Sequence, residues 1–112
     1  MDIAQQNFND WILGLLEKDS GTQLTSEEVG IALGYDDPRK SVLKIYEKNK
    51  EELGEYTDVV YVTARDEKSY LARVYNSQGV AVIAMLSGRP KARKFRAWLI
   101  GELKERRSSN KQ

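Results

Sequence analysis

The spacing of hydrophobic residues predicts an amphipathic helix near the N-terminus. Residues 3–18 carry apolar side chains at intervals of three and four, which places them on one helical face. These side chains are Phe8, Trp11, Ile12, Leu15 and Leu16. Such a face most often packs into the core of its own chain; the alternative is a helix that binds a partner or a second copy of the chain. Asp19-Ser20-Gly21 predicts its end.

Two shorter helices are expected next. Thr25-Ser26-Glu27-Glu28 has the pattern of a capping box, in which the threonine and the last glutamate bond each other's backbone N–H. Gly34 fits the left-handed position that ends a helix. Pro38 fits the first position of the following helix, which runs to about Lys48.

Two helices joined by a tight turn have the layout of a helix-turn-helix unit. The second helix of such a unit lies in the major groove of DNA, where Arg and Lys donate to guanine or phosphate. Here the second helix has a basic outer face. The residues predicted to contact DNA are Arg39, Lys40, Ser41, Lys44 and Lys48. Proteins that do not bind DNA share this layout, so the pattern alone leaves both readings open.

A β-hairpin is predicted after these helices. Residues 58–63 and 70–75 are rich in β-branched and aromatic residues, and a charged loop joins them. Arg65 and Lys68 in this loop would contact DNA if the hairpin acts as a wing. The alternative is a hairpin that only covers the core.

The C-terminal part of the chain predicts two further helices. Residues 78–86 are apolar on nearly all sides, which is typical of a buried helix, with Ser77 as the expected cap. The last helix begins at Pro90. Its inward residues are expected to be Ala92, Phe95, Trp98, Leu99 and Leu103. The whole pattern predicts an α+β fold that is mainly helical, with about five helices and a small antiparallel hairpin. One domain spans residues 1–105, and a polar, disordered tail follows at 106–112.

Basic residues crowd the start of this last helix. They are Arg89, Lys91, Arg93, Lys94 and Arg96. Because a helix N-terminus carries a partial positive charge, bases there are locally unfavourable and an anion is favourable. We therefore expect Arg89, Lys91, Arg93 and Lys94 to hold phosphates. The alternative is that these bases pair with acids of the N-terminal third.

The composition excludes several classes of function. The 112 residues include no Cys and no His, so disulfides, thiolate chemistry, imidazole catalysis and Cys- or His-ligated metal sites are absent. None of the acidic residues lies in a catalytic motif, and the sequence indicates no enzyme, no metal and no cofactor. No apolar stretch approaches the roughly 20 residues of a membrane span. We expect a cytoplasmic protein of a bacterial host cell without membrane contact.

The net charge of +1 conceals a gradient along the chain. Residues 1–37 hold eight acids and one base, a net charge of −7, whereas residues 65–112 hold twelve bases and four acids, a net charge of +8. The middle segment balances five bases against five acids. This separation favours a polyanion as partner of the basic part and leaves a basic protein open as partner of the acidic part.

Two stretches resemble the N-terminal domain of the BRO family. Residues 32–40, Ala-Leu-Gly-Tyr-Asp-Asp-Pro-Arg-Lys, are similar to one block of that family, and residues 74–99 to a second block that includes Ser87, Pro90, Ala92, Phe95 and Trp98. The resemblance covers roughly residues 27–103. It implies a viral or prophage DNA-binding module of the antirepressor type. The family usually opens with a β-hairpin, where this chain has the predicted helix 3–18.

The pattern and the resemblance together predict a DNA-binding transcription regulator of phage or prophage type that binds double-stranded DNA. The alternative is an antirepressor that binds a repressor protein without contacting DNA, to which the acidic N-terminal third would contribute. We also expect a homodimer, because paired half-sites increase specificity. The candidate partner or dimer residues are Phe8, Trp11, Ile12, Leu15 and Ile100.

Overall fold

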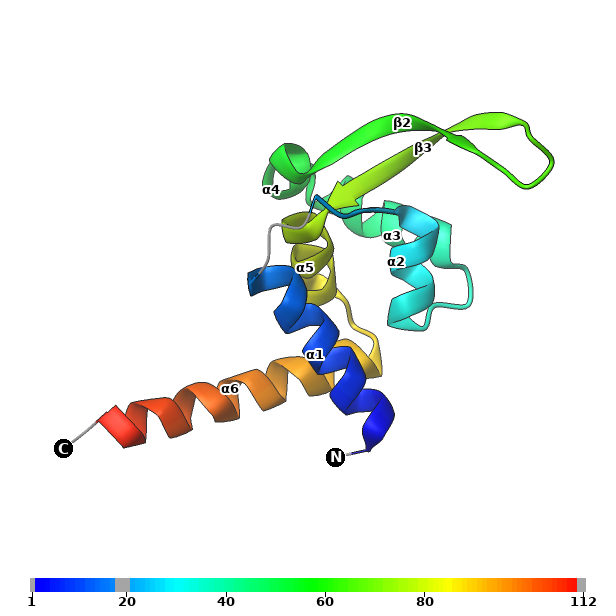
Figure 1. Cartoon of the computed structure of the whole chain (residues 1–112). Coiled ribbons are helices and arrows are strands. Elements are labelled where there is room, and N and C mark those ends of the chain that lie inside the picture. Colours follow the sequence, from blue (N-terminus) through cyan, green and yellow to red (C-terminus); the bar gives the residue numbers. More distant parts are fainter. Residues whose placement is uncertain (1, 18–20, 111–112) are drawn as a thin grey trace.

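The computed structural model describes residues 2–17 and 21–110, with side chains described as far as residue 105. These residues form an α+β fold of six α-helices, one 3-10 turn and a three-stranded antiparallel sheet (Figure 1). In chain order the elements are α1 (Ile3–Glu17), β1 (Gln23–Thr25), α2 (Ser26–Leu33), α3 (Pro38–Lys48), α4 (Lys50–Leu53), η1 (Gly54–Tyr56), β2 (Thr57–Thr63), β3 (Ser69–Asn76), α5 (Ser77–Leu86) and α6 (Pro90–Asn110).

The sheet has the strand order β1-β3-β2. The predicted hairpin is present, and its register runs from Thr57 opposite Tyr75 to Thr63 opposite Ser69. The sequence did not predict β1, which pairs with the base of β3 through Gln23 opposite Asn76. A three-residue strand is too short to display the alternation that identifies strands. The outer part of the hairpin therefore extends beyond β1 as a two-stranded arm.

The core is built around α5, as its apolar composition predicted. Val80 and Ile83 of α5 are fully buried, and α1, α3 and α6 pack around the helix. The ring of Phe8 in α1 meets that of Phe95 in α6 edge to face, with centroids 6.5 Å apart. The expected cap is corrected by one residue: Asn76, not Ser77, accepts the Gly79 N–H at 2.9 Å. Asparagine is as favourable a cap as serine, so sequence could not separate them.

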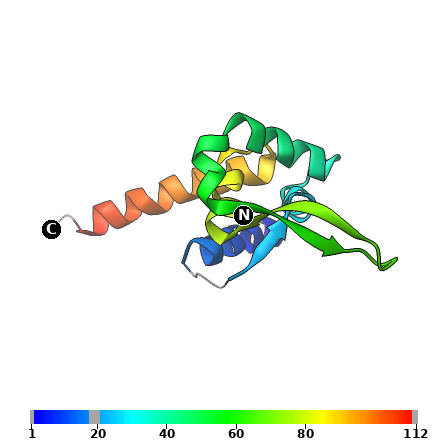
Figure 2. The same cartoon turned by 90° about the horizontal axis from the view of Figure 1, so that it is seen from above.

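Helix α6 and the hairpin project from opposite sides of the body (Figures 1 and 2), and with them the molecule measures 59 × 28 × 26 Å. Because α6 leaves the body, Leu103 is 56% exposed, contrary to its expected inward position. Leu16 at the end of α1 is also exposed rather than buried. The helix continues to Asn110, past the expected boundary at 106, since no Gly or Pro follows Gly101 within it and Lys, Arg and Glu favour helix. Residues 111–112 of the expected tail lie outside the described residues.

Candidate nucleic-acid interface

A close junction between α2 and α3 fixes the position of α3. The predicted capping box is present: the Glu28 N–H donates to Thr25 Oγ1 at 3.1 Å, and the Thr25 N–H donates to Glu28 Oε1 at 3.0 Å. Gly34 ends α2 in the left-handed conformation, with φ of 82°. At Gly30 a Cβ would lie 2.4 Å from the carbonyl oxygen of Pro38, so only glycine lets the two helices approach this closely. The start of α3 is therefore rigidly attached to α2.

The outer face of α3 is a basic groove, which we call the α3 groove. Its bases are exposed, and it is open with a volume of about 580 Å³. It is lined by Asp37, Arg39, Lys40, Leu43, Lys44, Glu47 and Lys48. Of its two acids, Glu47 is paired with Lys50 at 2.9 Å. Four of the five α3 residues that were predicted to contact DNA thus lie on one surface. The fifth, Ser41, is half-buried and does not line the groove.

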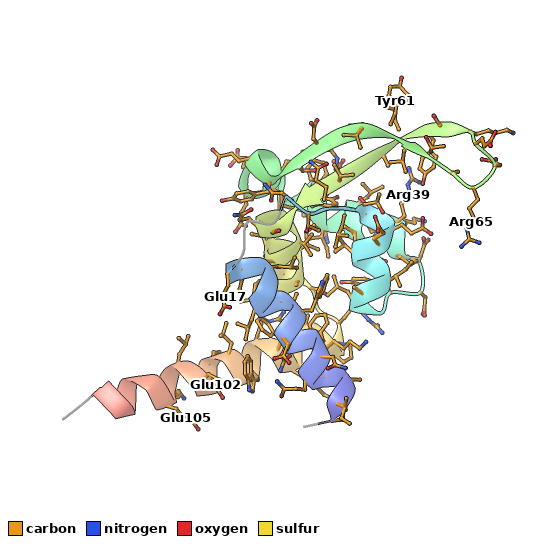
Figure 3. All side chains as sticks on the ribbon, viewed as in Figure 1. Glu17, Arg39, Tyr61, Arg65, Glu102 and Glu105 are labelled. Carbon is orange, nitrogen blue, oxygen red and sulfur yellow. The ribbon has the colours of Figure 1, made fainter. Side chains whose placement is uncertain are left out.

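The tip of the hairpin carries the two predicted wing residues, Arg65 and Lys68, both exposed. The Ala64 N–H donates to the carbonyl oxygen of Lys68 at 2.8 Å, which closes the turn. Figure 3 shows Arg65 pointing to the side of the hairpin on which α2 and α3 lie, whereas Tyr61 points to the other side. The hairpin thus presents a basic tip toward the side of the α3 groove.

The bases at the start of α6 fall into two groups, structural and exposed. Arg96 Nη1 donates to the carbonyl oxygens of Met85 at 3.0 Å and Ser87 at 2.7 Å, so this side chain caps the end of α5. The guanidinium of Arg89 lies 5.6 Å from the centre of the Tyr35 ring and is partly buried. The exposed bases are Lys91, Arg93 and Lys94. Within residues 2–17 and 21–105 no ion pair joins this region to the acidic N-terminal third.

Tyr35 connects the start of α6 to the turn before α3. Its hydroxyl bonds the Ser87 hydroxyl at 2.8 Å, and its ring packs under Arg89. Ser87 is fully buried and also accepts the Arg89 N–H at 3.2 Å. The segment before α6 is therefore attached to the turn before α3 through one tyrosine.

The structure relocates most candidate partner residues. Phe8, Ile12 and Leu15 are buried in the core of their own chain, with at most 8% exposed, so these three side chains are not available to a partner. Trp11 is partly buried against the same core. Ile100, on the projecting part of α6, is 55% exposed.

Sequence reasoning missed Arg73 on β3. Its guanidinium carbon lies 4.0 Å from the centre of the Tyr46 ring, and its Nη1 donates to Thr57 Oγ1 at 3.2 Å. It lines a small cleft between α2, α3 and β3, together with Arg39. An arginine inside an otherwise apolar strand sequence was the available indication, since charged residues rarely enter such strands without a partner.

Two further findings concern the described residues. In the described part of the chain, no group of three acidic residues lies close enough to hold a metal ion. Of the helices described, none has the length and apolar character needed to cross a membrane.

Residues 16–105 of the 112-residue chain match the BRO family, N-terminal domain. The chain belongs to the BRO family. The match begins before the expected residue 27, so it also includes the end of α1 and the strand β1. Comparisons with curated proteins and with solved structures gave no match. Membership of the BRO family places this chain among phage-type regulatory domains rather than in an enzyme family.

Proposed function

We propose that this BRO-family domain is a transcription regulator that binds double-stranded DNA through the α3 groove. The observation that carries the proposal is the gathering of Arg39, Lys40, Lys44 and Lys48 on one exposed face of a helix whose start is fixed by the Gly30–Pro38 contact. In this proposal α2 and α3 act as a helix-turn-helix unit, and α3 enters the major groove. Lysines and arginines on that face would contact phosphates and guanine edges.

Two further basic regions would extend the contact along the duplex. Arg65 and Lys68 at the hairpin tip would act as a wing on the backbone, on the side to which Arg65 points (Figure 3). Lys91, Arg93 and Lys94 would hold phosphates at the start of α6, which begins just after the Ser87 and Arg89 contacts with Tyr35. Arg89, packed on Tyr35, would contribute less because it is partly buried.

The test is binding of a fluorescent duplex at low and raised salt. Binding that weakens as salt rises is expected, because each neutralised phosphate releases counterions. The double reversal K40E/K44E should abolish binding, and K44E alone should weaken it far more than K104E, which reverses an exposed lysine on the projecting part of α6. Absence of wild-type binding even at low salt would contradict the proposal.

A second candidate function is an antirepressor that binds a repressor protein without DNA contact. The exposed apolar residues of the hairpin favour it: Tyr61 is 76% exposed, and Leu71, directly opposite on β3, is 55% exposed. In cells carrying a repressor-controlled reporter, K40E/K44E should abolish activity if DNA binding is the function. The same variant should remain active, and Y61S/L71S should lose activity, if the hairpin binds a repressor.

We also infer a homodimer. With Phe8, Ile12 and Leu15 inside the core, the surface that supports it is the projecting part of α6, where Ile100 and Leu103 are both more than half exposed. A dimer would place two α3 grooves on one duplex and raise specificity by reading two half-sites.

A further inference from the structure

A second, smaller cleft lies beside the α3 groove, beneath the hairpin. It has a volume of about 120 Å³ and is formed by the start of α2, the outer side of α3 and the strand β3. Arg39 and Leu43 line both this cleft and the α3 groove, so the two adjoin each other. Its volume is well below the roughly 300–1,000 Å³ of small-molecule sites, which leaves a group of phosphate size as the fitting occupant.

Arg73 lines this cleft, and its guanidinium is held at the edge of the cleft before any ligand arrives. Stacking on Tyr46 at 4.0 Å and the bond to Thr57 at 3.2 Å restrain its guanidinium from two different elements, α3 and β2. In the described part of the chain no carboxylate lies within ion-pair distance of it. Its other N–H groups can therefore donate to an oxyanion, and little side-chain entropy is lost when they do.

We propose that this cleft binds one backbone phosphate of the nucleic acid, with Arg73 and Arg39 as its donors. The inference rests on the proposed DNA binding and adds a contact made by the body of the hairpin rather than by its tip. Tyr70, on the same strand and 47% exposed, also lines the cleft and offers a hydroxyl donor. A backbone that passes from the α3 groove toward Arg65 would cross this point.

Glu27 allows the proposed phosphate site to be tested by the removal of a negative charge from the cleft. It lines the cleft as an exposed acid at the start of α2. There it favours the helix, because a carboxylate stabilises a helix N-terminus, but it would repel a phosphate. Loss of its charge should therefore lower stability slightly and strengthen DNA binding, two effects of opposite sign that a purely structural role would not produce.

The experiment measures affinity for a 20-base-pair duplex of arbitrary sequence across a salt series. R73M keeps the apolar stem but removes the charge; its affinity should fall about tenfold, and the slope of log affinity against log salt should become shallower by about one. R73K keeps the charge but not the planar fork, so its slope should remain while its affinity falls less. K104M, on the projecting part of α6, is the control for loss of one base and should match the wild type.

Glu27→Gln completes the design, with E105Q on α6 as the control for loss of one acid. E27Q should bind the duplex about two- to fivefold more tightly at low salt, as expected for removal of one repulsive charge near a phosphate, and E105Q should bind like the wild type. Melting temperatures of all variants identify losses of folding. If R73M does not fold, R73K and E27Q still decide the result.

The outcomes separate the two proposals. Wild-type binding that is lost in K40E/K44E but unchanged in R73M, R73K and E27Q would overturn the phosphate site and leave the proposed function standing. A wild-type chain that does not bind any duplex would overturn both. A shallower slope in R73M together with tighter binding by E27Q is the result expected for a phosphate in the cleft.

Discussion

The basic face of α3 and the basic start of α6 have the same kinds of residue but different surroundings. On α3 the four bases are exposed and line one open groove. At the start of α6, Arg96 caps the carbonyl end of α5 and Arg89 packs on Tyr35. Two of the bases at the N-terminus of α6, where positive charge is unfavourable, are thus explained by contacts within the fold. The number of bases in a stretch of sequence therefore overstates the number that are available to bind a ligand.

The largest loss of stability and of DNA binding is expected when α3 is displaced. A Cβ at Gly30 would overlap the backbone of Pro38, which cannot move aside as a flexible side chain would. G30A should lower the free energy of unfolding by about 3 kcal/mol, at the upper end of overpacking effects, and weaken DNA binding as the groove shifts. Urea denaturation measures the first effect and duplex binding the second.

The matched control for G30A is G101A. Gly101 lies within α6, and no atom beyond the neighbouring backbone of that helix lies within 4 Å of an added Cβ. Alanine there should raise stability by about 0.5–1 kcal/mol, because it favours helix over glycine. A G30A protein as stable as the wild type would show that the close α2–α3 approach does not hold α3.

Arg96 at the start of α6 should contribute to stability, unlike the exposed bases of the same helix. R96M removes two charge-assisted hydrogen bonds to the carbonyls at the end of α5 and should lower the free energy of unfolding by about 1–2 kcal/mol. R93M, at an exposed base of the same helix, should change stability by no more than about 0.5 kcal/mol. Equal effects of the two substitutions would mean that Arg96 is not a structural base.

Tyr75 tests how the sheet is held against α2. Its buried hydroxyl bonds Ser26 Oγ at 3.0 Å, so Y75F should cost about 1 kcal/mol of stability near neutral pH. Burial raises the pKa of the Tyr75 hydroxyl above its ordinary value, although the Ser26 bond opposes this. The folded state therefore favours the neutral phenol. The stability that the Tyr75 hydroxyl contributes is fully present below a pH of about 10 and is lost as the pH rises through the folded-state pKa.

The measurement for Tyr75 is the difference in unfolding free energy between wild type and Y75F from pH 7 to pH 11. Effects of the other tyrosines and lysines cancel in this difference. It should shrink as pH rises above about 10. A difference that stays constant over the whole range would contradict a buried, neutral Tyr75.

The smallest effect is expected at Ile100. I100D should leave stability unchanged, because the side chain is more than half exposed, but should convert a dimer into a monomer. Light scattering at high concentration should give the mass of two chains for the wild type and of one chain for I100D. A monomeric wild type would remove the proposed dimer without affecting the α3 groove.

Much of the fold could be predicted because local chemistry determines it. The capping box at Thr25, the left-handed Gly34 and the proline at the first position of α3 are all encoded within a few residues. The apolar α5 and the alternating hairpin followed from periodicity. Residues that form the α3 groove could be found because one helical face gathers them.

What could not be predicted depends on contacts between distant parts of the chain. The short strand β1 exists only because β3 pairs with it. Whether Arg96 binds a phosphate or caps α5 depends on where α5 ends, and the position of Arg73 depends on Tyr46 in another helix. Leu103 has the spacing of the buried residues of α6, but it lies beyond the point at which α6 leaves the core. The sequence of the helix does not show where that point is.

The central claim is that the bases of the α3 groove contact DNA whereas Arg96 serves the fold. The most direct test is the salt dependence of duplex binding for K40Q/K44Q/K48Q and for R96M. We expect the triple variant to fold normally and to have a slope of log affinity against log salt that is shallower by about 2–3. R96M, measured well below its melting temperature, should keep the wild-type slope. An unchanged slope in the triple variant, or a slope reduced only in R96M, would contradict the central claim.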